Sequence, residues 1–199
     1  FLSCGNNSKK IFERSSLDKK ISILLFLVIF IYYRKVMIIV RKNVLSFNNT
    51  TYTCAIGKNG ITSSKKEGDG CTPLGKYSLG TIYFRKDKVV LPKLNLPKMV
   101  IDKNTGWCDD INSYEYNKAI TFPFEYSAER LCRNDDIYDI ICIVEYNSNP
   151  VIKGKGSAIF IHVARDDYSG TEGCIALCKE DLITVLSQVS LQTKINIIS

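Results

Sequence analysis

The sequence predicts a mainly β domain with a single helix near its C-terminal end, and three observations support this fold class. From Met37 onward, short runs rich in Ile, Val, Tyr and Thr recur, as is typical of strands. Segments crowded with glycine, serine and charged residues separate some of these runs and predict loops or hairpins. Helical spacing of apolar residues is found in residues 179–189.

Five candidate strands come first along the chain. They are Met37–Arg41, Asn43–Phe47, Thr51–Ile56, Gly75–Arg85 and Ile137–Tyr146. Gly57–Pro73 is rich in glycine, serine and charge, so it is predicted to be a loop or hairpin. Residues 86–136 hold most of the prolines together with short polar clusters. This segment is predicted to be an irregular excursion over the surface rather than a second domain.

Three elements complete the predicted domain, which spans residues 37–199. Ser157–Val163 is a short apolar run and predicts a buried strand. Lys179–Val189 predicts the helix, because Leu182, Ile183, Leu186 and Val189 would share a face and two acidic residues lie near its N-terminus. Lys194–Ile198 predicts a closing strand.

Residues 1–36 differ from the rest and are interpreted as an N-terminal extension. Two lysines precede an apolar run, Ile21–Tyr33, and Arg34 and Lys35 follow it. As a helix this run rises about 20 Å, less than the roughly 30 Å hydrocarbon core of a bilayer. Its length fits a signal peptide, although no small-residue cleavage site follows. Two interpretations remain open: an export or membrane segment within residues 19–35, and a non-native upstream segment.

The distribution of charge argues against nucleic-acid binding. The chain has a net charge of +7, and residues 1–43, with nine basic and two acidic side chains, account for all of it. A protein that follows phosphates needs a basic surface on its folded body. Because the remaining residues are neutral overall, no nucleic-acid partner is expected.

The cysteines do not form a recognisable metal motif. The chain has eight cysteines and one histidine, and no two cysteines have C-x-x-C spacing. Several lie in apolar runs, as Cys54 and Cys142 do, and are interpreted as small buried hydrophobic residues. Cys178 follows Cys174 by four residues and is expected to be inert, since such a pair on a regular helix rarely meets disulfide geometry.

The segment from residue 156 to residue 178 carries the strongest chemical signal. His162 ends an apolar strand, a polar loop of eleven residues follows, and Gly173 and Cys174 begin another apolar run that leads into the helix. A thiolate is the reactive form of cysteine, and an imidazole can accept the thiol proton and return it to a leaving amine. Glycine before the nucleophile permits a sharp turn, after which the amides of Gly173 and Cys174 would face an oxyanion.

A purely structural interpretation competes with this one. Small buried cysteines are common, and a histidine near a cysteine in sequence is most often structural. However, His162 is the only histidine, so a Cys–His enzyme built on this chain has no other candidate base.

At these residues the chain resembles the L,D-transpeptidase (YkuD-type) catalytic domain. The similarity is carried by a strand ending in histidine, then a loop containing Thr171-Glu172-Gly173-Cys174-Ile175-Ala176-Leu177, then a helix. Gly68 to Tyr77 (GDGCTPLGKY) also resembles the family's β-hairpin, in which G-x-x-x-T-P-x-G-x-F/Y recurs. The resemblance covers roughly residues 37–198. It implies a β-sandwich or partly closed barrel with one helix near the active site.

The resemblance also implies roles for individual residues. Cys174 would be the nucleophile, His162 the base, Gly173 a contributor to the oxyanion hole and Thr171 the residue that shapes the turn. Arg165 would supply charge to the substrate, unless it is only a solvated loop cation. Trp107 would line the groove, unless it belongs to the core or the rim.

Three departures from the family pattern put the substrate in doubt. Glu172 replaces the histidine that normally precedes Gly173, at a position expected to contact substrate. Ala176 replaces an asparagine or arginine, which removes an expected contact to a substrate carboxylate or backbone. The loop between His162 and Cys174 is also shorter than in the family.

The activity implied is that of a cysteine acyltransferase of the bacterial cell envelope or periplasm. Such an enzyme cleaves the L,D bond of a peptidoglycan tetrapeptide stem and transfers the acyl group to an amine, giving a 3→3 cross-link. Carbapenem β-lactams are expected to acylate it, and no metal or organic cofactor is implied.

Several alternatives stay open. They are an L,D-carboxypeptidase or amidase that uses water, a catalytically silent wall-binding module, and a membrane-tethered structural protein. The last would need an apolar span nearer 20 residues. An NlpC/P60-type peptidase is disfavoured because that family places cysteine before histidine.

Overall fold

The computed structural model describes residues 21–25 and 37–199. Residues 21–25 are helical with exposed side chains. The rest of the predicted N-terminal extension, including most of the apolar run 21–33, lies outside the described residues, so its interpretation stays a prediction. Among the helices that are described, none is both long enough and apolar enough to span a bilayer.

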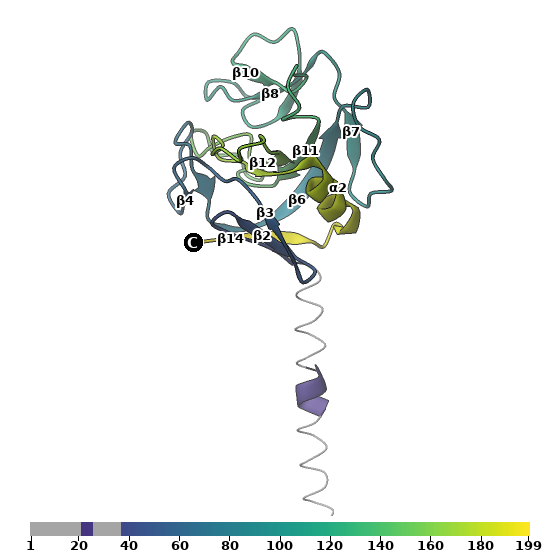
Figure 1. The fold of residues 1–199 in the computed structure, drawn as a ribbon. Helices are drawn as coiled ribbons and strands as arrows, with labels where there is room; N and C mark the ends of the chain where they lie inside the picture. The colour runs from purple at the N-terminus through teal and green to yellow at the C-terminus, as the bar shows by residue number, and fades with distance from the viewer. Residues whose placement is uncertain (1–20, 26–36) are drawn as a thin grey trace, which may run out of the picture. The chain divides into compact units, whose positions relative to one another are not determined.

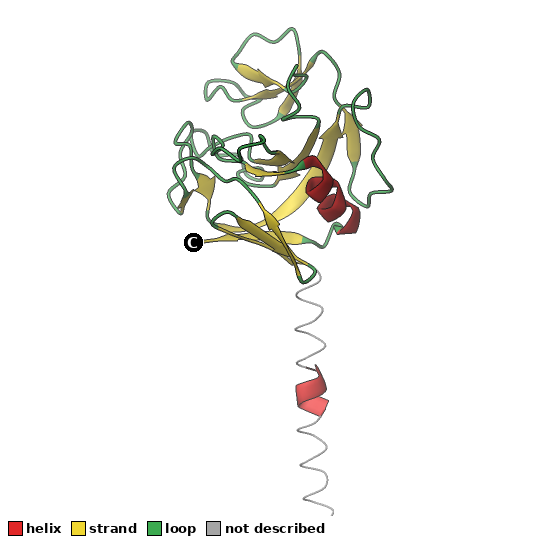
Figure 2. Cartoon of the chain, viewed as in Figure 1, coloured by secondary structure: helices red, strands yellow, loops and turns green. Residues whose placement is uncertain are grey.

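From Met37 the chain is mainly β, as predicted. The strands are β1 Met37–Arg41, β2 Val44–Phe47, β3 Thr50–Thr53, β4 Ile61–Thr62, β5 Thr72–Pro73, β6 Gly75–Phe84, β7 Lys98–Val100, β8 Thr105–Cys108, β9 Ala119–Thr121, β10 Ala128–Arg130, β11 Ile140–Val144, β12 Phe160–Val163, β13 Ile175–Leu177 and β14 Lys194–Ile198. The helix α2, Lys179–Gln188, follows β13 and precedes β14 in sequence; it is labelled in Figure 1 and red in Figure 2.

The large sheet has the order β13-β12-β11-β6-β14-β1-β2-β3, and β7 pairs with β6. Beyond β3, Ala55 and Ala176 of β13 exchange backbone hydrogen bonds of 2.8 and 2.9 Å. This bridge joins the two ends of the strand order, so the sheet is nearly closed into a barrel. Of the two predicted forms, sandwich or partly closed barrel, the structure has the barrel.

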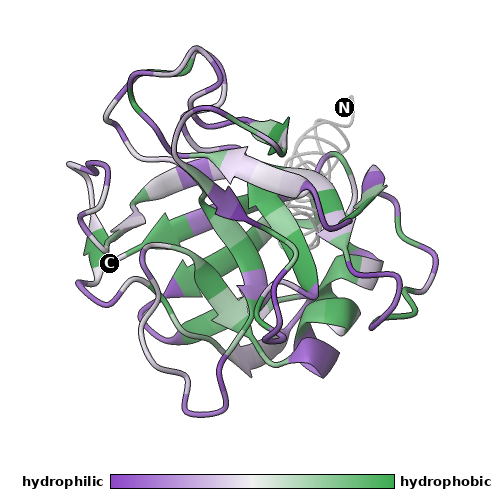
Figure 3. Cartoon of the chain, turned by 90° about the horizontal axis from the view of Figure 1, so that it is seen from above, coloured by the Kyte–Doolittle hydropathy of each residue, from purple (hydrophilic) through white to green (hydrophobic). Residues whose placement is uncertain are grey.

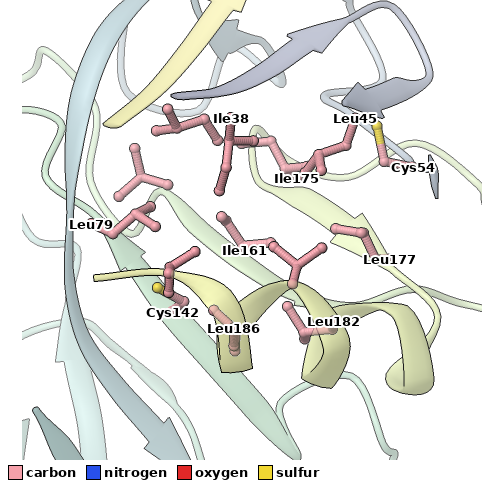
Figure 4. Packing of buried hydrophobic residues seen from close by; sticks show 14 of the residues in the cluster. Ile38, Leu45, Cys54, Leu79, Cys142, Ile161, Ile175, Leu177, Leu182 and Leu186 are labelled. Atoms are coloured by element: carbon pink, nitrogen blue, oxygen red, sulfur yellow. The ribbon is translucent and has the colours of Figure 1, made fainter. Parts of the chain in front are cut away.

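The main core fills the inside of this barrel and extends beneath the helix. In β1, Ile38 and Val40 are fully buried, whereas Ile39 between them is 36% exposed. This alternation is expected of a strand with one face exposed to solvent. Helix α2 contributes Leu182 and Leu186 to the same cluster (Figure 4). Burying each such side chain stabilises the fold by about 1.5–3 kcal/mol. Figure 3 shows hydrophobic residues along the strands and hydrophilic ones in the outer loops.

The prediction for residues 86–136 was only partly right. The segment does not form a separate domain, but it is not irregular throughout, because it contains β7 and a three-stranded sheet with the order β10-β8-β9. These strands have only three or four residues each, too few for a period-2 pattern to stand out in sequence. They contribute to a second apolar cluster that includes Trp107, Tyr138, Phe160 and Cys174.

Candidate active site

His162 lies on β12, and Cys174 immediately precedes the neighbouring parallel strand β13. In the register of β12 and β13, Ile161 is opposite Ile175 and His162 is opposite Ala176. Cys174 immediately precedes β13 and lies next to Phe160, whose amide is 3.3 Å from its sulfur. Because side chains alternate along a strand, residues two apart share a face, and His162 and Cys174 therefore project to the same side. Both line one cavity of about 510 Å³.

The thiol of Cys174 is buried and held by two backbone groups. Its Sγ–H donates to the carbonyl oxygen of Ala158 at 3.1 Å, and Sγ accepts the amide hydrogen of Phe160. Burial raises the pKa of Cys174 to about 12, against the opposing effect of the Phe160 amide. The resting side chain is therefore a neutral thiol.

His162 is buried with its tautomer fixed by the backbone. Its Nδ1 is 2.8 Å from the carbonyl oxygen of Val163. A carbonyl can only accept, so Nδ1 carries the hydrogen and Nε2 keeps its lone pair. The pKa of His162 is lowered to about 4, mainly by burial and in part by the positive charges of Arg165 and Arg133, against the opposing effect of the Val163 hydrogen bond. At neutral pH the ring is uncharged and has a free acceptor nitrogen.

Thr171 organises the turn that precedes Cys174. Its hydroxyl donates to the carbonyl oxygen of Cys174 at 2.6 Å and accepts the amide hydrogen of Gly173 at 3.1 Å. Its backbone pairs with that of Ile56 and Lys58 on the neighbouring segment. Hydrogen bonds thereby join the turn both to Cys174 and to the segment after β3 that closes the barrel.

Gly173 occupies a position that other residues fill only with strain. Its φ is +141°, and an added Cβ would lie 2.8 Å from the carbonyl oxygen of Cys71. The amide of Gly173 was expected to face an oxyanion. Here it donates to the Thr171 hydroxyl, so its first role is in the turn.

The remaining predicted site residues are spread over the rim and the interior. Arg165 and Glu172 are exposed on the cavity wall, and Glu172 forms an ion pair with Lys58 at 2.7 Å. Trp107 is not among the residues that line the cavity. It is buried against Phe160, with ring centroids 5.1 Å apart, and its Nε1 donates to Asn117.

Tyr138, which the sequence did not single out, lies directly against His162. The two ring centroids are 5.4 Å apart with their planes at 79°. The Tyr138 hydroxyl donates to the Glu129 carboxylate at 2.8 Å, and burial raises the pKa of Glu129. No local signal marks these residues, because each lies more than twenty positions before His162 and is brought to the site by tertiary packing.

Lys65 is the second residue that the sequence did not reveal. It is only 5% exposed and lines the same cavity, although it belongs to a loop rich in glycine and charge. A lysine in such a loop is normally solvated, so sequence alone gave no reason to place it inside.

Cys178 and Cys174 were expected to lie one turn apart on the same helix, and they do not. Strand β13 separates the two, so they do not lie on one helix, and Cys178 is the residue just before α2. All cysteines in the described part of the chain are unpaired.

Comparison with known proteins identifies the family of the chain. The chain matches no curated protein and no solved structure. Residues 27–197 match the sequence model of the YkuD family, described as the L,D-transpeptidase catalytic domain. This match covers most of the 199 residues. The chain therefore belongs to the YkuD family of L,D-transpeptidase catalytic domains, which are cell-wall enzymes that act on peptidoglycan stem peptides.

Proposed function

We propose that the chain is a cysteine L,D-acyltransferase in which Cys174 is the nucleophile and His162 its base. The observation that carries the proposal is that His162, on β12, and Cys174, immediately before the adjacent parallel strand β13, line one cavity. The neutral imidazole, with Nδ1 on the Val163 carbonyl, is in the tautomer that can accept a proton at Nε2.

In the first half-reaction, Cys174 attacks the carbonyl of the third stem residue while Nε2 of His162 takes the thiol proton. Because the resting pair is neutral, this proton transfer accompanies the attack and does not precede it. Collapse of the tetrahedral intermediate breaks the L,D peptide bond. The imidazolium returns its proton to the leaving amine, so D-Ala departs and a thioester on Cys174 remains.

Two features of the site support this step. The Phe160 amide already points at Sγ and would stabilise negative charge on sulfur as the thiol proton leaves. The turn held by Thr171 and Gly173 keeps the Cys174 backbone next to the cavity, where its amide would serve the oxyanion.

In the second half-reaction an amine from a neighbouring stem attacks the thioester and restores the thiol, giving a 3→3 cross-link. The cavity wall carries Glu67, Asp109 and Glu129, carboxylates that would attract the acceptor as an ammonium, which then gives up a proton and attacks as the free amine. Water in place of the amine would give an L,D-carboxypeptidase. Since the substrate is the wall, we place the enzyme in the bacterial cell envelope.

The test uses the purified, reduced chain with a disaccharide-tetrapeptide and, separately, with a carbapenem. We expect loss of D-Ala and a carbapenem adduct whose mass maps to Cys174. Cys174→Ala should abolish both, whereas Cys178→Ala, which removes a nearby thiol outside the cavity, should retain both. Cross-linked dimers would identify a transferase, and tripeptides alone a hydrolase. Absence of turnover and of adduct from folded protein would contradict the proposal and favour a silent wall-binding domain.

A further inference from the structure

Lys65 is a buried cation in the wall of the cavity that contains Cys174. Its side chain is 4% exposed, and its ammonium forms an ion pair with Asp69 at 2.6 Å. Burial dominates the pKa of Cys174 and raises it, and the Glu129 charge also raises it, whereas the Phe160 amide and the more weakly acting positive charge of Lys65 lower it. Lys65 and Cys174 line the same cavity, so the ammonium is placed to meet an anionic group of a molecule bound there.

The loop around Lys65 holds this side chain in place. Asp69 accepts hydrogen bonds from the amides of Lys66 and Cys71 as well as from Lys65. The amide of Glu67 donates to the carbonyl oxygen of Gly154, which ties the loop to the segment leading into β12. The position of Lys65 is thus set by the hydrogen bonds around Asp69 and by the bond from Glu67 to Gly154.

Gly156 provides the space that the lysine occupies. Its φ is +103°, and an added Cβ would lie 3.2–3.3 Å from Cγ, Cε and Nζ of Lys65. Two residues later, the carbonyl of Ala158 accepts the Cys174 thiol hydrogen. The lysine and the thiol therefore contact the same short stretch of backbone.

The ammonium of Lys65 has one more hydrogen than its acceptors in the described part of the chain use. It donates to Asp69 Oδ1 and to the carbonyl oxygen of Lys66 at 2.8 Å. An ammonium has three hydrogens, so one remains for a group in the cavity.

The other cations that line this cavity are less suited to bind an anion beside Cys174. Arg133 is held by Asp135 through two hydrogen bonds of 2.6 and 2.9 Å. Arg165 is exposed, where water weakens its attraction for an anion. Of the three, Lys65 is the one that is buried and has a hydrogen left to donate.

We propose that Lys65 binds the free carboxylate of the residue that leaves from the stem peptide, and so selects donors with an uncapped C-terminus. This inference rests on the proposed function, in which the leaving residue is D-Ala. Its carboxylate is one residue from the carbonyl attacked by Cys174 and must be accommodated close to the sulfur. The Asn or Arg that the family places at position 176 is absent, and Lys65 supplies a positive charge from another element.

The alternative is that Lys65 only braces its loop through Asp69. A test that separates the two compares alkylation of Cys174 by anionic iodoacetate and by neutral iodoacetamide, with peptide mapping of the modified cysteine. Both reagents react with the same thiolate, so the ratio of their rates cancels any change in the thiol pKa. The ratio reports the charge that an incoming carboxylate encounters.

We expect the iodoacetate-to-iodoacetamide ratio at Cys174 to fall about tenfold in Lys65→Met. Lys65→Arg should keep most of the ratio. Lys66→Met is the matched control, because it removes the same charge from the exposed neighbour in the same loop and should leave the ratio unchanged. An equal ratio in Lys65→Met and wild type would overturn the proposal.

A measurement on wild type keeps the proposal testable even if Lys65→Met does not fold. The ratio at Cys174 should then exceed that of N-acetylcysteine amide, a neutral free thiol, and an equal or lower ratio would refute a cation at the sulfur. In turnover, tetrapeptide with a C-terminal carboxamide should have a KM about tenfold above that of the free acid, and Lys65→Met should remove this difference. If neither peptide is turned over, the proposed function fails while the alkylation ratio still decides the role of Lys65.

Discussion

The rings of Tyr138 and His162 form an edge-to-face contact, with centroids 5.4 Å apart and ring planes at 79°. The Tyr138 hydroxyl is anchored on Glu129, and Arg133 lies over the other part of the ring, its Cζ 5.3 Å from the centroid. The Val163 carbonyl fixes one nitrogen of the imidazole, and Tyr138 limits the tilt of its plane. Tyr138 is therefore a positioning residue for the proposed base.

Replacing Tyr138 tests this positioning role. Tyr138→Leu removes the ring, and we expect kcat to fall about tenfold with little change in KM, because the imidazole loses its orientation. Tyr138→Phe keeps the ring and removes only the hydroxyl, so its kcat should stay within about threefold of wild type. Steady-state kinetics on the tetrapeptide would measure both. Equal losses in the two variants would show that the bond to Glu129, and not the ring contact, is what matters.

Gly173 offers a test of the turn before the nucleophile. Gly173→Ala places a Cβ 2.8 Å from the Cys71 carbonyl oxygen at a φ of +141°. We expect the free energy of unfolding to drop by about 2–4 kcal/mol. Gly154→Ala is the matched control, since its φ is +81° but an added Cβ meets nothing within 4 Å, and it should cost about 1 kcal/mol. Urea denaturation would measure both variants. A similar loss of unfolding free energy in Gly173→Ala and Gly154→Ala would mean that the backbone around Cys71 moves to accommodate the added Cβ.

The sequence predicted the strands and the helix well where the run of apolar or β-branched residues was long enough to show its periodicity. β1 and β14 have the predicted bounds, and α2 ends one residue earlier than expected. The pairing of β1 with β14 is parallel and joins the two ends of the domain, a long-range contact that periodicity cannot reveal. The short strands β7 to β10 were missed because three or four residues are too few to show a period-2 pattern.

The candidate site was predictable only in its local part. His162, Thr171, Gly173 and Cys174 lie within thirteen residues, so their spacing could be recognised in sequence. Tyr138 enters the site because β11 pairs with β12, and Lys65 because its loop folds over the segment before β12. Such residues are brought in by tertiary packing, and a single sequence carries no signal for that.

The packing around Ala176 explains why this chain has alanine where the family has asparagine or arginine. Ala176 is 1% exposed, lies opposite His162 in register and forms the backbone bridge to Ala55. Ala176→Asn would restore a family residue, but it would crowd a packed position, and we expect a loss of about 2–4 kcal/mol in the free energy of unfolding. Ala119→Asn, on an exposed strand position, should change stability by less than about 1 kcal/mol. Thermal or urea unfolding would compare the two, and a stable, more active Ala176→Asn protein would contradict this.

Burial of His162 makes folding stability depend on pH in a defined window. The folded-state pKa is about 4, lowered by burial, whereas an unfolded histidine titrates near 6.5. Above pH 6.5 both states are neutral and His162 has no effect. As the pH falls from 6.5 to 4, the unfolded chain binds a proton that the folded protein does not, so stability is lost on acidification.

This loss is measurable as a difference between wild type and His162→Gln, whose side chain does not titrate. Between pH 7 and pH 5, the free energy of unfolding of wild type should fall by about 2 kcal/mol more than that of the variant. Urea unfolding of both proteins at each pH gives the difference directly, and the carboxylates of the fold contribute equally to both. Parallel pH curves would show that His162 is solvated or takes up a proton in the folded protein. It would then rest as an imidazolium at mildly acidic pH and could not accept the Cys174 proton there.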